Sequence, residues 1–473
     1  MAKNSCNYNF KVIKYKRMDN YVHAKFIKIK EDIRVSDLTL KDTAARGRLA
    51  SLFDNGIFTE IDAFAKSENG DVEVAAGFGT VNGAPVYAFS QDVTVNGGAV
   101  SIAQCAKIKK VYNLAAKTGC PIVGIYDSNG MKLTEGFEAL NAYGEIVKAS
   151  ASVSGVVPQI SVIAGACVGT SALIANMADI VVAVKNADFY ITVPSELTVD
   201  ECAESGTVDI AADDFDNAVD FVKKIICLLP SNNLSSPPVF DFEEPDTNVE
   251  NAKSPLEIVN SVADSGSVLE LKSNYAENAV TAFASVAGST VGFVAFGGSE
   301  LCPSCAYKVE AFVKLCDAFN IPVITFLDSK GLSKENENNM LVAATKLTAA
   351  YTAATCPKIS VVTGSAIGAA YIVLAGRYSN ADLVYAWDNT VISPLDTKAA
   401  VAFLYNKRLA DGEKREELEK EYIENMASPF TAAACGAIDD VFVSTETRGK
   451  IIAALDVLVG KRETTLPRKH SVK

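Results

Sequence analysis

Two short runs of small residues are the strongest candidates for chemistry in this sequence. Gly169 and Thr170 stand at the start of the apolar segment SALIANMA, and Gly368 and Ala369 at the start of AAYIVLAG. If both segments are helices, their first backbone N–H groups have no intrahelical partner and favour negative charge. A carbonyl oxygen could approach such amides, which would then form an oxyanion hole for an enolate-type oxygen. The alternative is that the small residues serve only close packing of helix on strand.

Other residue types exclude several classes of site. The only two histidines, His23 and His470, lie near the chain ends, which argues against a histidine-ligated metal and against a Ser-His-Asp triad. Cys302 and Cys305 form a single CxxC, and without a second one a zinc site is not expected. We read this pair as two thiols flanking a helix rather than as a redox or metal site.

Composition narrows the function further. The 473 residues are 49% hydrophobic and 21% charged, with a net charge of −13, so we expect a large buried core and no nucleic-acid binding. Eleven scattered cysteines and no apolar leader predict a cytoplasmic protein with reduced thiols. The longest apolar run begins at Ile160 and is too short to cross a membrane, which takes about 20 residues.

An internal repeat organises the chain. VPQISVIAGACVGTSALI resembles CPKISVVTGSAIGAAYIV, so that Gly165 and Gly169 match Gly364 and Gly368 at an offset of 199. Upstream, GCPIVGIYDSNGM pairs with NIPVITFLDSKGL at an offset of 201, and LFDNGIFTEI with VADSGSVLEL at 210. Because the order is kept and the offsets drift little, the sequence predicts a duplicated domain and not a short-period solenoid.

The repeat sets the expected organisation. Residues 236–253 are rich in Pro, Asn and acidic residues and are expected to be a linker. We therefore predict an N-terminal extension over 1–43 and two domains over 44–235 and 254–473. Each copy alternates expected strands and helices with Gly-rich turns, which predicts an α/β fold with ligands at the carboxyl ends of the strands.

Local patterns give more specific expectations. Asn82-Gly83 predicts a hairpin, and QCAKIKKVYNLAAKTG an amphipathic helix that ends at Gly119. ISVIA and IVVAV are expected to be buried strands, with GACVGT as the turn after the first of them. KRLADGEKREELEKEYIENMA is expected to be one charged amphipathic helix at the surface or at a subunit contact.

Long stretches resemble a known family. They include AARGRLASLFDNG, FSQDVTVNGGAVS, YDSNGMKLTEG and SGVVPQISVIAGACVGTSALI in the first copy, and FVKLCDAFNIPVITFLDSKG, ATCPKISVVTGSAIGAAY and SPFTAAACGAIDDVF in the second. Over about residues 44–460 the chain resembles the carboxyltransferase subunits of biotin-dependent acyl-CoA carboxylases, of the propionyl-CoA carboxylase β type. The resemblance implies two crotonase-like domains per subunit and a homo-hexamer, with active sites between the first domain of one subunit and the second domain of another.

The resemblance also implies roles for individual residues. Gly169 and Thr170 would hold the enolate oxygen of a short-chain acyl-CoA thioester, and Gly368 and Ala369 the ureido oxygen of carboxybiotin. The coenzyme A site would be lined by Gly97, Gly98, Gly130, Met131, Lys132 and Arg46. Biotin would arrive on a biotin carboxyl carrier protein and be charged by a biotin carboxylase subunit. No catalytic metal is implied.

Several positions depart from the family pattern. Thr170 and Ala369 stand where the family usually has Gly, and Lys132 where it has Arg. Ile372 stands where propionyl-type members often have Asp, which favours a broader or shorter acyl range. The loop after Asp328 is polar instead of apolar.

One glutamate and two arginines near these positions could each have a role in the site or a purely structural role. Glu135 would be a general acid or a solvated helix start. Arg46 and Arg48 would reach coenzyme A phosphates or occupy an exposed helix face.

Three alternative functions remain open at this stage. The chain could be the carboxyltransferase subunit of a sodium-pumping acyl-CoA decarboxylase that works with a membrane subunit. It could be a weakly active scaffold paralogue. It could also be a crotonase-type hydratase or isomerase that acts without biotin.

Overall fold

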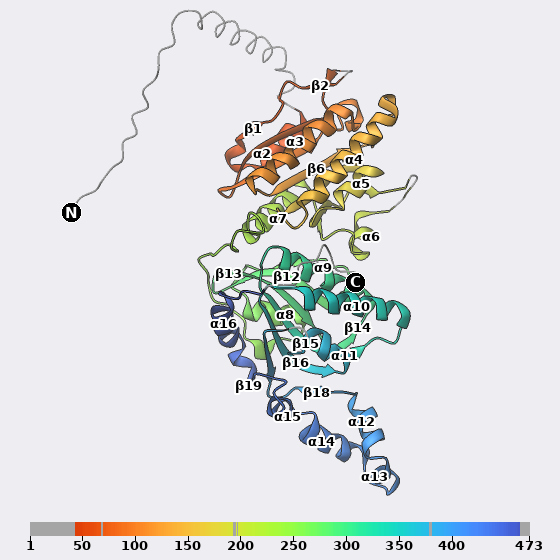
Figure 1. Cartoon of the computed structure of the whole chain (residues 1–473), viewed down its shortest axis with the longest axis vertical. Helices are drawn as coiled ribbons and strands as arrows, with labels where there is room; N and C mark the ends of the chain where they lie inside the picture. Colours follow the sequence, from red (N-terminus) through yellow and green to blue (C-terminus); the bar gives the residue numbers. More distant parts are fainter. Residues whose placement is uncertain (1–42, 68–69, 193–194, 196, 378–380, 464–473) are drawn as a thin grey trace, which may run out of the picture.

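The computed structural model describes residues 43–67, 70–192, 195, 197–377 and 381–463. Nearly all of the expected N-terminal extension lies outside these ranges, as do both histidines. The described chain is built around two large mixed sheets, one from each half of the sequence. In Figure 1 the two sheets follow one another along the long axis of the molecule, with the first half above the second.

The first half contains an eight-stranded sheet in the order β1-β4-β5-β6-β7-β8-β10, with β9 paired to β7. Its strands are β1 (Phe58–Glu60), β4 (Val74–Val81), β5 (Ala84–Gln91), β6 (Ile122–Ser128), β7 (Gln159–Val168), β8 (Ile180–Val184), β9 (Asp188–Tyr190) and β10 (Ile210–Ala212), and a separate ribbon pairs β2 (Lys66–Ser67) with β3 (Gly70–Asp71). Its helices are α2 (Ala44–Leu52), η2 (Asp54–Gly56), η3 (Asn96–Gly98), α3 (Ile102–Thr118), η4 (Leu133–Glu135), α4 (Gly136–Val153), α5 (Thr170–Ala175), α6 (Val199–Glu204) and α7 (Phe215–Leu228).

The second half contains a nine-stranded sheet in the order β11-β12-β13-β15-β16-β17-β19, with β14 paired to β15 and β18 to β16. Its strands are β11 (Leu269–Leu271), β12 (Ala279–Val286), β13 (Ser289–Phe296), β14 (Ser299–Leu301), β15 (Val323–Leu332), β16 (Lys358–Ile367), β17 (Leu383–Trp387), β18 (Val391–Ser393) and β19 (Asp440–Phe442). Its helices are η5 (Val249–Asn251), α8 (Pro255–Val262), α9 (Pro303–Ala318), α10 (Glu337–Ala353), α11 (Ala369–Leu374), α12 (Thr397–Leu404), α13 (Asn406–Ala410), α14 (Arg415–Met426), α15 (Pro429–Ala434), η6 (Ser444–Glu446) and α16 (Thr447–Leu458).

The strand orders confirm the internal repeat. Each strand of the first sheet has a counterpart in the same place in the second, where β14 is the one additional strand. In order, β1, β4, β5, β6, β7, β8, β9 and β10 correspond to β11, β12, β13, β15, β16, β17, β18 and β19. The β4–β5 hairpin and its counterpart β12–β13 close in the same way. In the first, the Asp54 carboxylate accepts hydrogen bonds from the amides of Asn82 and Gly83, both at 2.9 Å. Asp264 does the same for the equivalent hairpin of the second half, with the amides of Ala287 and Gly288. The LFDNG and VADSG motifs therefore recur because each supplies the carboxylate that closes a hairpin.

Several local expectations are confirmed. The hairpin at Asn82-Gly83 has positive φ at both residues, the backbone that a two-residue type I′ turn requires. Helix α3 is capped by the Ser101 hydroxyl and ends at Gly119, which has φ 66°. A left-handed residue at this position suits glycine, because glycine has no Cβ.

Two local expectations are wrong. The charged segment 407–427 forms two helices, α13 and α14, because the chain turns at Gly412 with φ 94°. GACVGT is not a turn throughout, because β7 continues through Gly165 to Val168 and pairs there with the short strand β9. The same extension occurs in β16, which pairs with β18.

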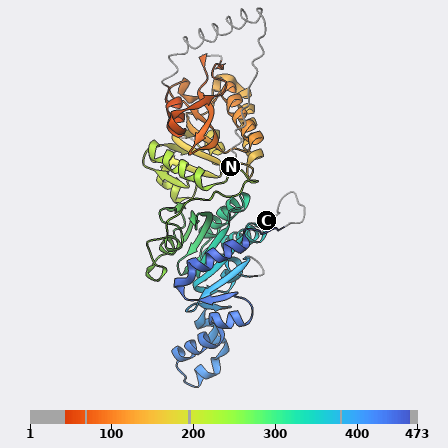
Figure 2. The ribbon, with the colours of Figure 1, turned by 90° about the vertical axis from the view of Figure 1, so that its left-hand side faces the viewer.

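The two halves share part of their hydrophobic core. Helix α7 packs on β8 and β10 of the first sheet and also touches β12 of the second. One continuous cluster of buried side chains accordingly contains Ile225 and Leu228 of α7 together with Leu269 and Phe283 of the second half. Figure 2 shows α12–α14 at the lower end of the molecule, beyond the second sheet.

A carboxylate packed against a glycine shapes the strand ends of both halves. A Cβ on Gly165 would lie 2.2 Å from Oδ1 of Asp127, and one on Gly364 would lie 2.3 Å from Cγ of Asp328. Oδ2 of Asp127 is held by Arg48 at 2.7 Å, and Oδ1 of Asp328 accepts the Ser365 amide at 2.7 Å. Neither carboxylate can therefore move aside cheaply, so position 165 or 364 must be glycine.

We expect Gly364→Ala to lower the free energy of unfolding by about 1–3 kcal/mol, because the new methyl group overlaps Asp328. Gly47→Ala is the matched control: a Cβ there meets nothing within 4 Å, and an exposed helical alanine should be neutral or stabilise by about 0.5–1 kcal/mol. Denaturant unfolding at one protein concentration measures both. Equal stability of the two variants would contradict the packing argument.

Candidate functional site

The first small-residue turn combines a glycine of positive φ with an open helix start. Gly169 has φ 65° and ψ −132°, and its amide donates to the carbonyl of Tyr190 at 3.0 Å. Helix α5 begins at the next residue, Thr170. Within the described part of the chain no hydrogen-bond acceptor is recorded for the Thr170 amide. The glycine thus sets the direction of the chain, and Thr170 carries the first open amide.

The second turn repeats this geometry. Gly368 has φ 58° and ψ −130°, and its amide donates to the carbonyl of Ser393 at 2.8 Å. Helix α11 begins at Ala369, whose amide likewise has no recorded acceptor among the described residues. In both halves the glycine amide is occupied by a neighbouring strand, which leaves the following amide as the available donor.

A second turn lies beside each helix start. In the first half the Ser128 hydroxyl accepts the Gly130 amide at 3.2 Å, and Gly130 has φ 105°. A Cβ on Gly130 would lie 3.8 Å from Cγ2 of Val168, the residue before the small-residue turn. Each half therefore brings its DSxG turn against the strand end that leads into its open amide, since Ser329, Gly331 and Ile367 are arranged in the same way.

Four residues expected to line the coenzyme A site come together around this first turn. The Asn129 amide donates to the Gly97 carbonyl at 3.1 Å, and the Val100 amide to the Gly130 carbonyl at 2.8 Å. Met131 pairs with Val100 in an isolated parallel bridge. Gly98 has φ 65°, and a Cβ there would lie 2.4 Å from the carbonyl oxygen of Asp127, so only glycine fits.

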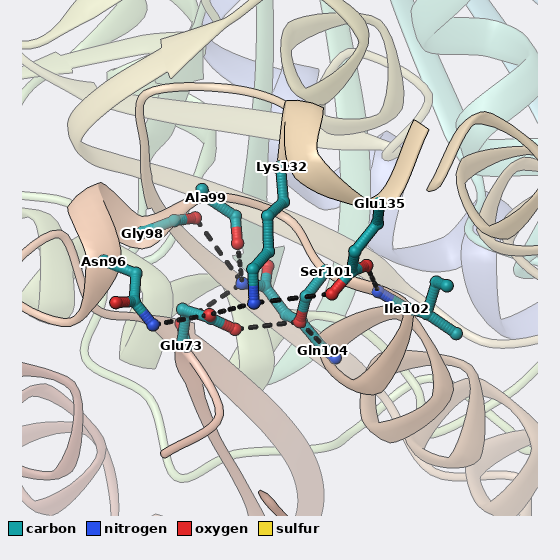
Figure 3. Close-up of polar contacts among 9 residues, drawn as sticks. All are labelled: Glu73, Asn96, Gly98, Ala99, Ser101, Ile102, Gln104, Lys132 and Glu135. Atoms are coloured by element: carbon teal, nitrogen blue, oxygen red, sulfur yellow. Dashed lines mark hydrogen bonds and ion pairs between the residues drawn. The ribbon is translucent and has the colours of Figure 1, made fainter. Parts of the chain in front are cut away.

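Lys132 belongs to a buried ionic cluster. Its Nζ lies 3.4 Å from Glu73 and 3.4 Å from Glu135 (Figure 3). Glu73 is fully buried and also accepts hydrogen bonds from the Ser101 hydroxyl at 2.8 Å and from the Asn96 amide group at 2.9 Å. With two carboxylates next to it, the Lys132 charge is neutralised inside the protein and holds the turn in place.

Glu135 is not a solvated helix start, so that interpretation is wrong. Its side chain is only 8% exposed. One carboxylate oxygen accepts the Ile102 amide at 2.6 Å, at the first residue of α3 (Figure 3). Glu135 therefore caps one helix while it pairs with Lys132.

The two arginines do not lie on an exposed helix face. Arg46 makes a bidentate ion pair with Glu60, in which Nε and Nη2 lie 3.0 and 3.1 Å from the two carboxylate oxygens. Arg48 binds Asp127 at 2.7 Å, and each arginine side chain is 19% exposed. Both guanidinium groups are engaged by carboxylates of this chain.

One polar pair near the first turn has no counterpart in the sequence-based expectations. The Tyr143 hydroxyl of α4 lies 3.0 Å from the Ser171 hydroxyl, directly after Thr170. Burial raises the pKa of Tyr143, so the phenol keeps its proton. The 28-residue separation of the pair carries no spacing signal; only the structure brings the two hydroxyls together.

Ile372 lies on α11 and is 54% exposed. In Figure 1 the helices α5 and α11 lie in different halves of the molecule, with α9 and α10 between them. One chain therefore presents two separate turns rather than one joined site.

The described residues contain no group of three or more His, Cys, Asp or Glu side chains arranged to hold a metal ion. Within the same ranges, no helix has both the length and the apolar character that a membrane span requires.

Comparisons with known proteins identify the family of the chain. The family described as carboxyl transferase domain matches residues 41–472. The chain is 33% identical to the methylmalonyl-CoA decarboxylase subunit alpha of Veillonella parvula, over 90% of this chain and 92% of that one. It is 34% identical to the propionyl-CoA carboxylase beta chain of Saccharopolyspora erythraea, over 90% and 89%.

A similar solved structure is the transcarboxylase 12S crystal structure, a hexamer with methylmalonyl-coenzyme A and methylmalonic acid bound. It matches with a TM-score of 0.86 and 31% identity, covering 97% of this chain and 99% of that one.

We expect Lys132→Met to lower the free energy of unfolding by about 3–5 kcal/mol, because Glu73 would remain buried without its cation. The double variant Glu73→Gln, Lys132→Met should recover most of this loss, which a double-mutant cycle from denaturant unfolding measures. Unchanged unfolding together with a raised KM for a coenzyme A thioester would instead identify Lys132 as a phosphate ligand.

Proposed function

Because the chain belongs to the carboxyl transferase family, we propose that it moves a carboxyl group between biotin on a carrier protein and the α-carbon of a short-chain acyl-CoA, such as acetyl- or propionyl-CoA. The chain is an enzyme of this family and has the expected duplicated, crotonase-like α/β fold. The observation that carries the proposal is the matched pair of open helix-start amides, each beside a DSxG turn.

The first half is the acyl-CoA side in this proposal. The Thr170 amide donates to the thioester oxygen and stabilises the negative charge that develops there as the enolate forms. Gly97, Gly98, Gly130 and Met131 shape the approach of the coenzyme A chain. The absence of side chains at the glycines allows the ligand to lie close to the backbone.

The second half fits the ureido group of biotin. Ala369 offers the same type of amide donor as Thr170, and a Cβ on Gly368 would be only 3.2 Å from the Pro394 carbonyl oxygen, so a side chain there would crowd the turn. When bound, biotin supplies or accepts the carboxyl group. The chain binds the ureido oxygen through the Ala369 amide, and Ile372 on the same helix borders the acyl group.

A complete site requires two copies of the chain. Leu133 and Phe137, beside the first-half turn, are 79% and 74% exposed, and Leu341 of α10 is 69% exposed. Helix α10 packs on α11, so this second apolar surface adjoins the other turn. Contact between these surfaces of two subunits would bring Thr170 of one copy toward Ala369 of the other, within a homo-hexamer.

The proposed partners are a biotin carboxyl carrier protein and a biotin carboxylase subunit, in the cytoplasm. The decarboxylase relative of Veillonella parvula favours a second candidate, in which the same site works in the decarboxylating direction with a membrane subunit. The two differ in partners and not in the chemistry of this chain. A scaffold role is the further alternative that Thr170 and Ala369, in place of Gly, would favour.

Replacing the open amides tests the proposal. Thr170→Pro and Ala369→Pro remove one N–H each at the first helical position, where proline is tolerated. We expect kcat to fall by about 10²–10³-fold in each, because one oxyanion donor is lost. The assay is decarboxylation of methylmalonyl-CoA or malonyl-CoA in the presence of saturating free biotin.

Thr170→Ala is the matched control, since it keeps the amide and should retain activity within a few-fold. No turnover of either substrate by the unmodified chain would favour the scaffold role. Hydration or isomerisation of an enoyl-CoA without biotin would favour a crotonase-type reaction.

Ile372 is proposed to set acyl preference. Ile372→Asp should shift kcat/KM toward propionyl-CoA over acetyl-CoA by about tenfold, the scale on which one methylene is discriminated. Competition between the two thioesters measures the ratio. An unchanged ratio would show that residue 372 does not border the acyl group.

A further inference from the structure

Two cysteines begin the long helix α9. Cys302 is the N-cap residue, and its Sγ accepts the Cys305 amide at 3.2 Å. Cys302 is partly exposed, whereas Cys305 is 1% exposed. An accessible sulfur thus binds the backbone amide of a protected cysteine across the first turn of a helix.

The other half of the chain shows that capping alone does not explain these cysteines. Ser101 is the N-cap of α3, and its hydroxyl accepts the Gln104 amide at 3.1 Å, in the same geometry. Both pairs are offset by 201 residues. Serine is a preferred N-cap, and cysteine sulfur is a weak acceptor. The second half therefore has a poorer cap and, at the matched position three residues on, a second thiol.

The fold around the pair is that of a βαβ unit. Strands β13 and β15 are parallel neighbours, and α9 connects them. A CxxC that opens the helix of such a unit has the spacing of thiol–disulfide redox motifs, in which the helix N-terminus favours the thiolate of the first cysteine. The pKa of Cys302 is lowered to about 6, first by its hydrogen bond with Cys305. The contact with Cys302 and burial raise the pKa of Cys305, so this thiol keeps its proton, and the buried ammonium group of Lys308, one turn further along α9, only opposes the rise.

We propose that Cys302 and Cys305 form a redox-active dithiol that small-molecule disulfides convert reversibly to an intrachain disulfide. The Cys302 thiolate attacks one sulfur of the reagent disulfide, forms a mixed disulfide and releases one thiolate. The Cys305 sulfur then attacks Cys302, and its proton passes to the second thiolate that leaves. The protein gives up two electrons, and one reagent disulfide becomes two thiols.

Oxidation of the full chain by glutathione disulfide tests the proposal. After exposure, free thiols are alkylated and the chain is digested without reduction. Mass spectrometry then gives the mass of the peptide that contains both cysteines. We expect this peptide to carry an internal disulfide that dithiothreitol removes. In Cys305→Ser the attack should stop at a glutathione adduct on Cys302. In Cys302→Ser, Cys305 should stay unmodified.

Cys302→Ser is a sound control for folding, because serine caps α3 at the matched position. Cys435→Ser is the control for an exposed thiol outside the pair, and it should form the Cys302–Cys305 disulfide as the unmodified chain does. Alkylation of Cys302 should also level off above about pH 7, whereas an ordinary thiol of pKa about 8.5 continues to gain rate.

Either of two results would overturn the proposal. One is full alkylation of Cys302 and Cys305 after exposure to glutathione disulfide. The other is oxidation of Cys305 to the same extent in Cys302→Ser as in the unmodified chain.

Discussion

Each half of this protein depends on the close approach of an aspartate carboxylate to a glycine that has no side chain in its way. Asp127 lies near the end of β6 and occupies the space in which Gly165 of the next strand would carry a Cβ. This close approach coincides with a register shift between β6 and β7, after which Ser128 pairs with Cys167. The shifted strand ends then carry the DSxG turn and the open helix start side by side. Asp328 and Gly364 produce the same arrangement in the second half.

The two halves hold this aspartate in place by different means. In the first half the carboxylate is neutralised by Arg48, whose guanidinium also donates to the Gln91 carbonyl. In the second half the recorded donor to Asp328 is a backbone amide, that of Ser365. The first-half turn is further tied down by the buried cluster around Lys132. The strand ends of the first half are thus held by ion pairs, whereas Asp328 in the second half is held by a backbone amide.

Much of the fold could be predicted because the repeat and the turn chemistry are local signals. The Asn82-Gly83 hairpin, the end of α3 at Gly119 and the duplicated order of segments all follow from residue type and spacing. Burial of charge could not be predicted in this way. Lys132, Glu135, Arg46 and Arg48 are polar in sequence, and only their partners decide that they are ion-paired rather than solvated. Glu60 and Asp127 lie 14 and 79 residues from the two arginines, and Glu73 lies 59 residues from Lys132. The same limit applies to Gly169, whose amide is occupied by a strand 21 residues further on.

The core that α7 shares between the sheets has a consequence for the independence of the halves. Ile225 and Leu228 lie on α7 in the first half of the sequence, yet they belong to a buried cluster that continues into β11 and β12 of the second half. Cutting the chain between α7 and α8 would expose apolar surface on both fragments. Although the two halves repeat one unit, each now depends on the other to keep water from this face.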